Sequence, residues 1–171
     1  MTHLPNKRIY LICMIILLSA ACCFSGCNTN PPPKDRVEKL YLKFESDFLS
    51  VSNYLTSIPA DSAYITDVSG EIRIDLTDQQ ISDPLIVDSL RHLWRAGCSS
   101  ISMDRSDNSI KFVIWKTKQI GDAEAGILYA IDTDDSKDVT TQYLTELQPI
   151  TGAWYYYVAD YEEWRTHRQN E

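Results

Sequence analysis

The sequence predicts an α+β domain, in which a mostly antiparallel sheet of five or six strands packs against a long N-terminal helix and a second, shorter helix. Three observations predict it. Apolar residues recur every three or four positions between residues 37 and 58, apolar and polar residues alternate in later segments, and the two kinds of element do not alternate regularly along the chain. The 171 residues are enough for one domain with a sizeable core.

The long helix is predicted over residues 35–58. Asp35 and Glu38 resemble a capping box at its start, and Pro59 closes its far end. Its apolar positions form one stripe, which we expect to lie across one face of the sheet. They are Val37, Leu40, Tyr41, Phe44, Phe48, Val51, Leu55 and Ile58.

The next segments predict a hairpin and the second helix. Residues 64–68 and 72–76 read as strands joined by a turn at Ser69 and Gly70. The helix is predicted over residues 84–96, because Asp83 can cap it, Pro84 suits its first position and Gly97 suits the residue just past its end.

Four more strands are predicted, over residues 99–103, 110–117, 127–131 and 154–159. Residues 104–109 form a polar turn between the first two of them, as an antiparallel pair requires. Residues 132–150 are polar and irregular in pattern, and the one element considered for them is a short helix near residues 141–147.

The N-terminus carries the marks of an export signal. Lys7 and Arg8 precede an uncharged, mostly apolar run over residues 9–24, and Ser25 and Gly26 follow it. Sixteen residues are short for a membrane-spanning helix, which needs about twenty.

The segment Phe24-Ser25-Gly26-Cys27 resembles the lipobox of bacterial lipoprotein precursors, with Phe24 in place of the usual Leu, Val or Ile. The resemblance implies that Cys27 receives a diacylglyceryl group and becomes the mature N-terminus. Cys22 and Cys23 follow poorer sites and would leave with the signal. A plain cleaved signal and an uncleaved membrane anchor are the alternatives.

The predicted organisation has four parts: a signal peptide over residues 1–26, a lipidated cysteine with a proline-rich tether over 27–34, a single domain over 35–161 and a polar tail over 162–171. Removing 26 of 171 residues leaves 145. The net charge moves from −8 to −10, because the signal contains two basic residues and no acidic ones. Such acidity argues against nucleic acid as a partner. The expected location is extracytoplasmic, with the protein anchored by lipid to the cell membrane. In a Gram-negative cell, the outer membrane is also possible.

Patterns that suggest catalysis or ion binding are weak. Asp88 and His92 are spaced as a helical pair, which is also ordinary for an exposed helix face. Cys98 follows Gly97 in a position that suits a buried thiol. The acidic loop over residues 132–138 fails the EF-hand pattern at Lys137 and Tyr143, so we expect a solvated turn there. We therefore predict neither a metal nor a cofactor.

The aromatic segment over residues 154–164 is the remaining candidate site. In a strand, Tyr155 and Tyr157 would share one face of the sheet, and Trp115 would join them from a neighbouring strand. Exposed aromatic rows bind sugars, peptides or proteins, although strand aromatics are commonly packing residues.

The function expected is that of an envelope lipoprotein with a non-catalytic binding or accessory domain. Its partners would be the membrane, through the lipid, and an envelope protein, peptide or glycan. The alternative is an envelope hydrolase that uses Asp132, Asp134 and Glu124 in a cleft.

Overall fold

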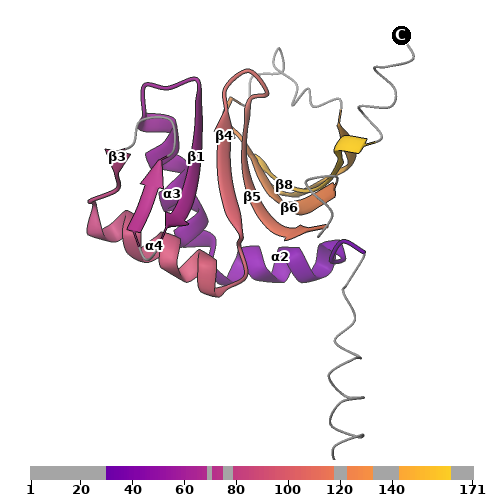
Figure 1. Ribbon diagram of the computed structural model, residues 1–171. Helices are drawn as coiled ribbons and strands as arrows, with labels where there is room; N and C mark the ends of the chain where they lie inside the picture. Colours follow the sequence, from indigo (N-terminus) through magenta and orange to yellow (C-terminus); the bar gives the residue numbers. More distant parts are fainter. Residues whose placement is uncertain (1–29, 69–70, 75–78, 118–122, 133–142, 163–171) are drawn as a thin grey trace, which may run out of the picture. The chain divides into compact units, whose positions relative to one another are not determined.

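The computed structural model describes residues 30–68, 71–74, 79–117, 123–132 and 143–162. The chain divides into two compact units, residues 1–30 and 31–171, and every element below belongs to the second (Figure 1). No helix in the described parts of the chain is long and apolar enough to cross a membrane.

The predicted long helix is wrong, because the structure has two shorter helices in its place. They are α2 (Lys34–Lys43) and α3 (Glu45–Ser57). Phe44 separates them with φ −122° and ψ 24°, outside the helical region. The apolar stripe did not reveal the break, because Tyr41 and Phe48 still face the same core from either side of it. The predicted capping box is also absent: Pro33 is the N-cap of α2, without a side-chain cap.

The second helix agrees with the prediction. α4 spans Pro84–Arg95, and the carboxylate of Asp83 accepts a hydrogen bond from the Leu85 N–H at 2.9 Å. Gly97 follows the helix with φ 105°, a conformation that L-residues rarely adopt. α4 therefore begins and ends where the sequence indicates.

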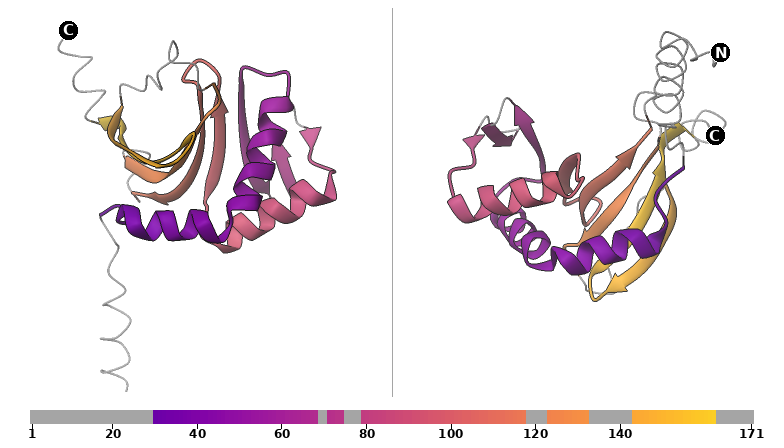
Figure 2. Two further views of the ribbon diagram at one scale, coloured as in Figure 1. Left: turned by 180° about the vertical axis from the view of Figure 1, so that it is seen from behind. Right: turned by 90° about the horizontal axis from the view of Figure 1, so that it is seen from below.

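One antiparallel sheet forms the rest of the domain, with strand order β3-β2-β1-β4-β5-β6-β8-β7. Figure 2 shows α2, α3 and α4 on one of its faces, with β5, β6 and β8 strongly bent. The strands are β1 (Ser62–Val68), β2 (Glu71–Ile74), β3 (Gln79–Gln80), β4 (Ser100–Asp104), β5 (Ser109–Lys116), β6 (Ala123–Ala130), β7 (Leu144–Thr151) and β8 (Trp154–Asp160).

The α+β class and the antiparallel sheet are confirmed, and the sheet contains two strands beyond those expected. β3 has two residues, and β7 occupies the segment for which a short helix was considered. β7 pairs with β8 through a register that shifts twice, and Pro149 lies within it. β3 and β7 are the outermost strands, so each edge is either very short or irregular.

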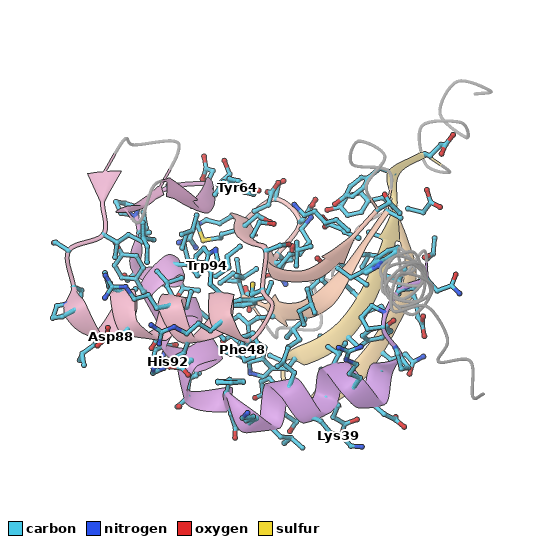
Figure 3. The ribbon with its side chains drawn as sticks, turned by 60° about the horizontal axis from the view of Figure 1, so that its bottom comes forward. Lys39, Phe48, Tyr64, Asp88, His92 and Trp94 are labelled. Carbon is cyan, nitrogen blue, oxygen red and sulfur yellow. The ribbon has the colours of Figure 1, made fainter. Side chains whose placement is uncertain are left out.

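The main core lies between the helices and the sheet and is rich in aromatic rings. Phe48, labelled in Figure 3, meets Phe112 edge-on with ring centroids 5.0 Å apart. The ring centroids of Tyr41 and Trp154 are 5.1 Å apart. All four rings are buried. A second, smaller cluster is formed by Leu128, Tyr157 and Ala159.

The fold also includes part of the predicted tether. Pro32 is buried, and its carbonyl oxygen accepts a hydrogen bond from the Tyr156 hydroxyl at 2.9 Å. The Pro33 carbonyl then accepts the amides of Arg36 and Val37 at the start of α2. The sheet therefore binds the chain three residues before Asp35, where the sequence placed the start of the domain.

Candidate functional site

The two tyrosines singled out in the sequence lie on the predicted face of β8. Residues of β8 alternate between the main core and the smaller cluster, and Tyr155 and Tyr157 belong with the latter. Tyr157, however, is 0% exposed, and Tyr155 is half-buried. Tyr143, Leu144 and Tyr161 pack against this cluster. The two tyrosines are therefore part of a packed layer and do not form an exposed row.

Trp115 does not join them. β5 and β6 change register between Val113 and Trp115, and Trp115 is paired with Ala125. Ala125 is in turn paired with Val158, which packs against the main core. Since paired residues point to the same face, the bulge moves Trp115 to the helix-covered side.

Gly126 occupies the β6 position beside this bulge. A Cβ atom added there would lie 2.0 Å from the Phe112 carbonyl oxygen. No side chain fits at that distance, so glycine is required for the close approach of β5 and β6.

Around the smaller cluster, the side chains form a polar and aromatic network that sequence reasoning missed. We call it the tyrosine–carboxylate cluster: Asp107, Lys111, Glu124, Tyr143, Tyr157 and Tyr161. Its first half is centred on Glu124, whose Oε1 accepts hydrogen bonds from Tyr157 at 3.2 Å and Tyr161 at 2.8 Å. Three elements thus meet at one carboxylate: β6, β8 and the residues after β8.

The second half is centred on Tyr143. Its hydroxyl donates to Asp107 Oδ2 and accepts a hydrogen bond from Lys111 Nζ at 2.8 Å. Lys111 is only 8% exposed, and its Nζ also lies 4.7 Å from the centroid of the Tyr143 ring. The rings of Tyr143 and Tyr161 are stacked with centroids 4.8 Å apart, which joins the two halves.

Burial controls the protonation of this cluster. Burial lowers the pKa of Lys111, and the negative charges of Glu124, Asp107 and Asp104 partly offset this by raising it. Burial raises the pKa of Tyr157 and Tyr161, and so do the charge of Glu124 and the hydrogen bonds it accepts. The phenols therefore remain neutral donors near pH 7.

The role of the cluster is structural: its hydrogen bonds hold several elements of the sheet together. The carboxylates of Glu124 and Asp107 bind phenol hydroxyls of the same cluster, so these polar groups satisfy one another across several strands. One signal in the sequence was available: Lys111 stands in an otherwise apolar strand, between Ile110 and Phe112. A lysine there needs an internal partner.

The two described residues of the hydrolase alternative, Asp132 and Glu124, take part in separate interactions. Asp132 exchanges two backbone hydrogen bonds with the side chain of Asn108, at 2.7 and 2.8 Å. Glu124 belongs to the tyrosine–carboxylate cluster, and Asp134 lies outside the described residues with most of the acidic loop. Among the residues that the structure places, no group of three His, Cys, Asp or Glu side chains is arranged to hold a metal ion.

The helical pair on α4 is also separated. His92 Nδ1 lies 3.3 Å from Asp47 Oδ1 on α3, whereas Asp88 pairs with Arg91 (Figure 3). Cys98 is 4% exposed and donates to the Ser100 carbonyl. Burial raises the pKa of its thiol to about 12, which makes it a poor nucleophile, as its sequence context suggested.

A small cavity lies against α4. It is lined by Ile72, Arg91, Trp94 and Arg95 and has a volume of about 150 Å³. Sites for small molecules usually have volumes of ~300 Å³ or more. The cavity is therefore too small for a typical small-molecule site, and one of its lining residues, Arg91, is already paired with Asp88.

The predicted lipidation site, Cys27, lies outside the described residues. The structure shows instead where the chain that follows it becomes fixed, at the hydrogen bond between Tyr156 and Pro32.

Comparison with known proteins finds no family model, no curated protein and no solved structure that matches this chain.

Proposed function

We propose that the protein is a bacterial envelope lipoprotein, anchored by lipid at Cys27, whose α+β domain is a non-catalytic binding or accessory module held close to the membrane. The observation that carries the proposal is the hydrogen bond from Tyr156 to the buried Pro32 carbonyl, five residues after Cys27. This hydrogen bond fixes the chain shortly after the lipobox-like segment 24–27, so the proposed tether between the lipid and the domain is short.

The distance to the bilayer follows from the chain. Residues 28–31 separate Cys27 from Pro32. Five Cα–Cα steps span at most about 17 Å when fully extended. A secreted domain with a cleaved signal has no need of such a short, fixed connection, whereas an anchored accessory domain is held at a defined height by it.

A binding or accessory role is favoured over hydrolysis by the state of the carboxylates. Glu124 and Asp107 are engaged by phenol hydroxyls, and the nearest lysine, Lys111, is buried with them. General acid–base catalysis needs a group that is free to exchange a proton with a substrate.

The ligand proposed is an envelope protein, a peptide or a glycan, reached from outside the cytoplasmic membrane. Of the three aromatic residues predicted to bind it, Tyr155 is the one that remains partly accessible on the face opposite the helices. An outer-membrane location is proposed for a Gram-negative host. Nucleic acid is not proposed, because the net charge of −8 repels phosphates.

Metabolic labelling with a fatty-acid probe tests the anchor. The wild-type chain should be labelled and should partition with membranes, and Cys27→Ala should lose both properties. Cys22→Ala and Cys23→Ala are the matched controls and should keep the label. Labelling that persists in Cys27→Ala, or that is absent from the wild type, would refute the proposal.

A further inference from the structure

We infer that the outward face of α2 is a membrane-docking surface, which binds anionic phospholipid headgroups and orients the domain on the bilayer. The inference rests on the proposed lipid anchor and goes beyond it, because an anchor alone would leave the domain free to rotate. It predicts which side of the domain faces the lipid and which side faces a partner.

The chain places α2 next to the bilayer. The hydrogen bond from Tyr156 fixes Pro32, and α2 begins two residues later at Lys34. A ten-residue helix is about 15 Å long, comparable to the longest reach of the tether. The start of α2 is therefore seven residues from Cys27 in the chain, and its far end is at most one helix length further away.

The outward face of α2 is basic. Val37 and Tyr41 are buried beneath the helix, whereas Arg36, Lys39 and Lys43 are exposed. Figure 3 shows Lys39 on the side of α2 that faces away from the sheet. Asp35 is the one exposed acidic residue of the helix.

An exposed leucine lies among these basic residues. Leu42 is 61% exposed, and Lys43 Nζ lies 5.1 Å from the centroid of the Phe44 ring at the end of the helix. A helix that presents Lys and Arg together with apolar side chains suits the headgroup region of a bilayer.

The charge of this helix contrasts with that of the whole protein. α2 contains four basic residues and two acidic ones, while the chain has 16 basic and 24 acidic residues. Asp104 ends β4, Asp107 is in the turn that follows it, and Ser62, the neighbour of Asp61, is paired with Asp104. Figure 1 shows the turn between β4 and β5 at the end of these strands away from α2. An anionic surface attracts one end of such a domain and repels the other.

The anchor makes a weak attraction sufficient. Because the lipid and the short tether keep α2 near the bilayer, docking becomes an intramolecular step with a high effective concentration. The Debye length is ~8–10 Å at physiological salt, so the basic side chains attract the headgroups when α2 lies against the bilayer and are screened when it does not.

The test uses the mature lipidated protein, reconstituted into vesicles and carrying one thiol-reactive donor fluorophore. The donor is placed at Leu42→Cys on α2 or at Ser106→Cys in the turn between β4 and β5, and energy transfer to a headgroup-labelled lipid is measured. Cys98 is buried and does not compete for the label. Vesicles contain phosphatidylcholine alone or with about one quarter phosphatidylglycerol.

With phosphatidylglycerol present, transfer from position 42 should exceed transfer from position 106 by about twofold or more, and about 0.5 M salt should reduce the difference. The combined variant Arg36→Gln, Lys39→Gln, Lys43→Gln should abolish the difference. The control Arg91→Gln, Arg95→Gln, Lys116→Gln removes the same charge from exposed positions elsewhere and should preserve it.

Flotation of the same vesicles separates the two proposals. Protein that floats with vesicles but transfers energy equally from both positions refutes the docking surface and leaves the anchor intact. If the α2 variant and its control lose the difference in energy transfer equally, the docking surface is also refuted. Wild-type protein that is isolated without lipid at Cys27 and does not float refutes the proposed function itself.

Discussion

Replacing Tyr156 with phenylalanine should loosen the connection between the N-terminal segment and the sheet. The substitution keeps the ring, which belongs to the main core, and removes only the hydroxyl that donates to the Pro32 carbonyl. A neutral hydrogen bond contributes ~1 kcal/mol net, and a buried carbonyl left without a donor costs ~1–3 kcal/mol. We expect the free energy of unfolding to fall by about 1–2 kcal/mol.

Two measurements check this prediction. Urea unfolding followed by circular dichroism gives the global loss, and Tyr155→Phe is the matched control because Tyr155 is only half-buried and its hydroxyl has no hydrogen bond to another described residue. Hydrogen exchange gives the local loss: the amides of Arg36 and Val37, which donate to Pro33, should exchange roughly 5–30 times faster in Tyr156→Phe.

The stability that Tyr156 contributes depends on pH with a definite sign. Burial raises the pKa of Tyr156, and the nearby Glu146 raises it further, so the neutral phenol is favoured in the fold. The stability from this group is fully present below the unfolded pKa of about 10 and is lost as the pH rises through the folded pKa. The reasoning fails if Tyr156→Phe is as stable as Tyr155→Phe and its N-terminal amides exchange at the wild-type rate.

Three more predictions concern the sheet. Gly126→Ala should cost about 1–3 kcal/mol in urea unfolding, because its Cβ would lie 2.0 Å from the Phe112 carbonyl oxygen, and a loss below ~0.5 kcal/mol would contradict the close approach. Glu124→Ala should lower the free energy of unfolding by about 2–4 kcal/mol, because it leaves two phenols without an acceptor. Glu124→Gln should recover part of this loss, and equal stability of the two variants would refute the structural role of the tyrosine–carboxylate cluster. Tyr157 and Tyr161 have raised pKa values, so their stabilisation should be complete below the unfolded pKa of about 10 and be lost as the pH rises from there through their folded pKa values; ultraviolet titration should show them ionising only as the protein unfolds.

The helix faces could be predicted because they depend on local periodicity. Val37, Tyr41 and Phe48 are all buried, as their spacing required. The break at Phe44 could not be predicted in the same way, because Tyr41 on α2 and Phe48 on α3 are seven residues apart and both are buried, as they would be on one continuous helix. α4 was predicted in full because its limits depend on single residues, Asp83 and Gly97, with specific backbone roles.

The candidate site was harder to predict because it depends on contacts between distant segments. The bulge between Val113 and Trp115 reverses the face of Trp115, and it lies beside Gly126 on the neighbouring strand, where a Cβ would overlap the Phe112 carbonyl oxygen. Tyr157 is buried by Tyr143, 14 positions earlier, and by Tyr161, four positions later. The alternation of residues within β8 does not reveal these contacts. β7 was missed because its polar, proline-containing sequence becomes a strand by pairing with β8.

The two edges of the sheet matter for a protein held on a surface. Anchored copies diffuse in a plane and meet far more often than free ones, and an open strand edge would let them add to one another strand by strand. Here one edge ends in the two residues of β3, and the other contains Pro149 and two register shifts. Within the described residues, neither edge offers a regular ladder of unpaired backbone groups, so copies brought together by the proposed anchor would not be expected to template a fibril.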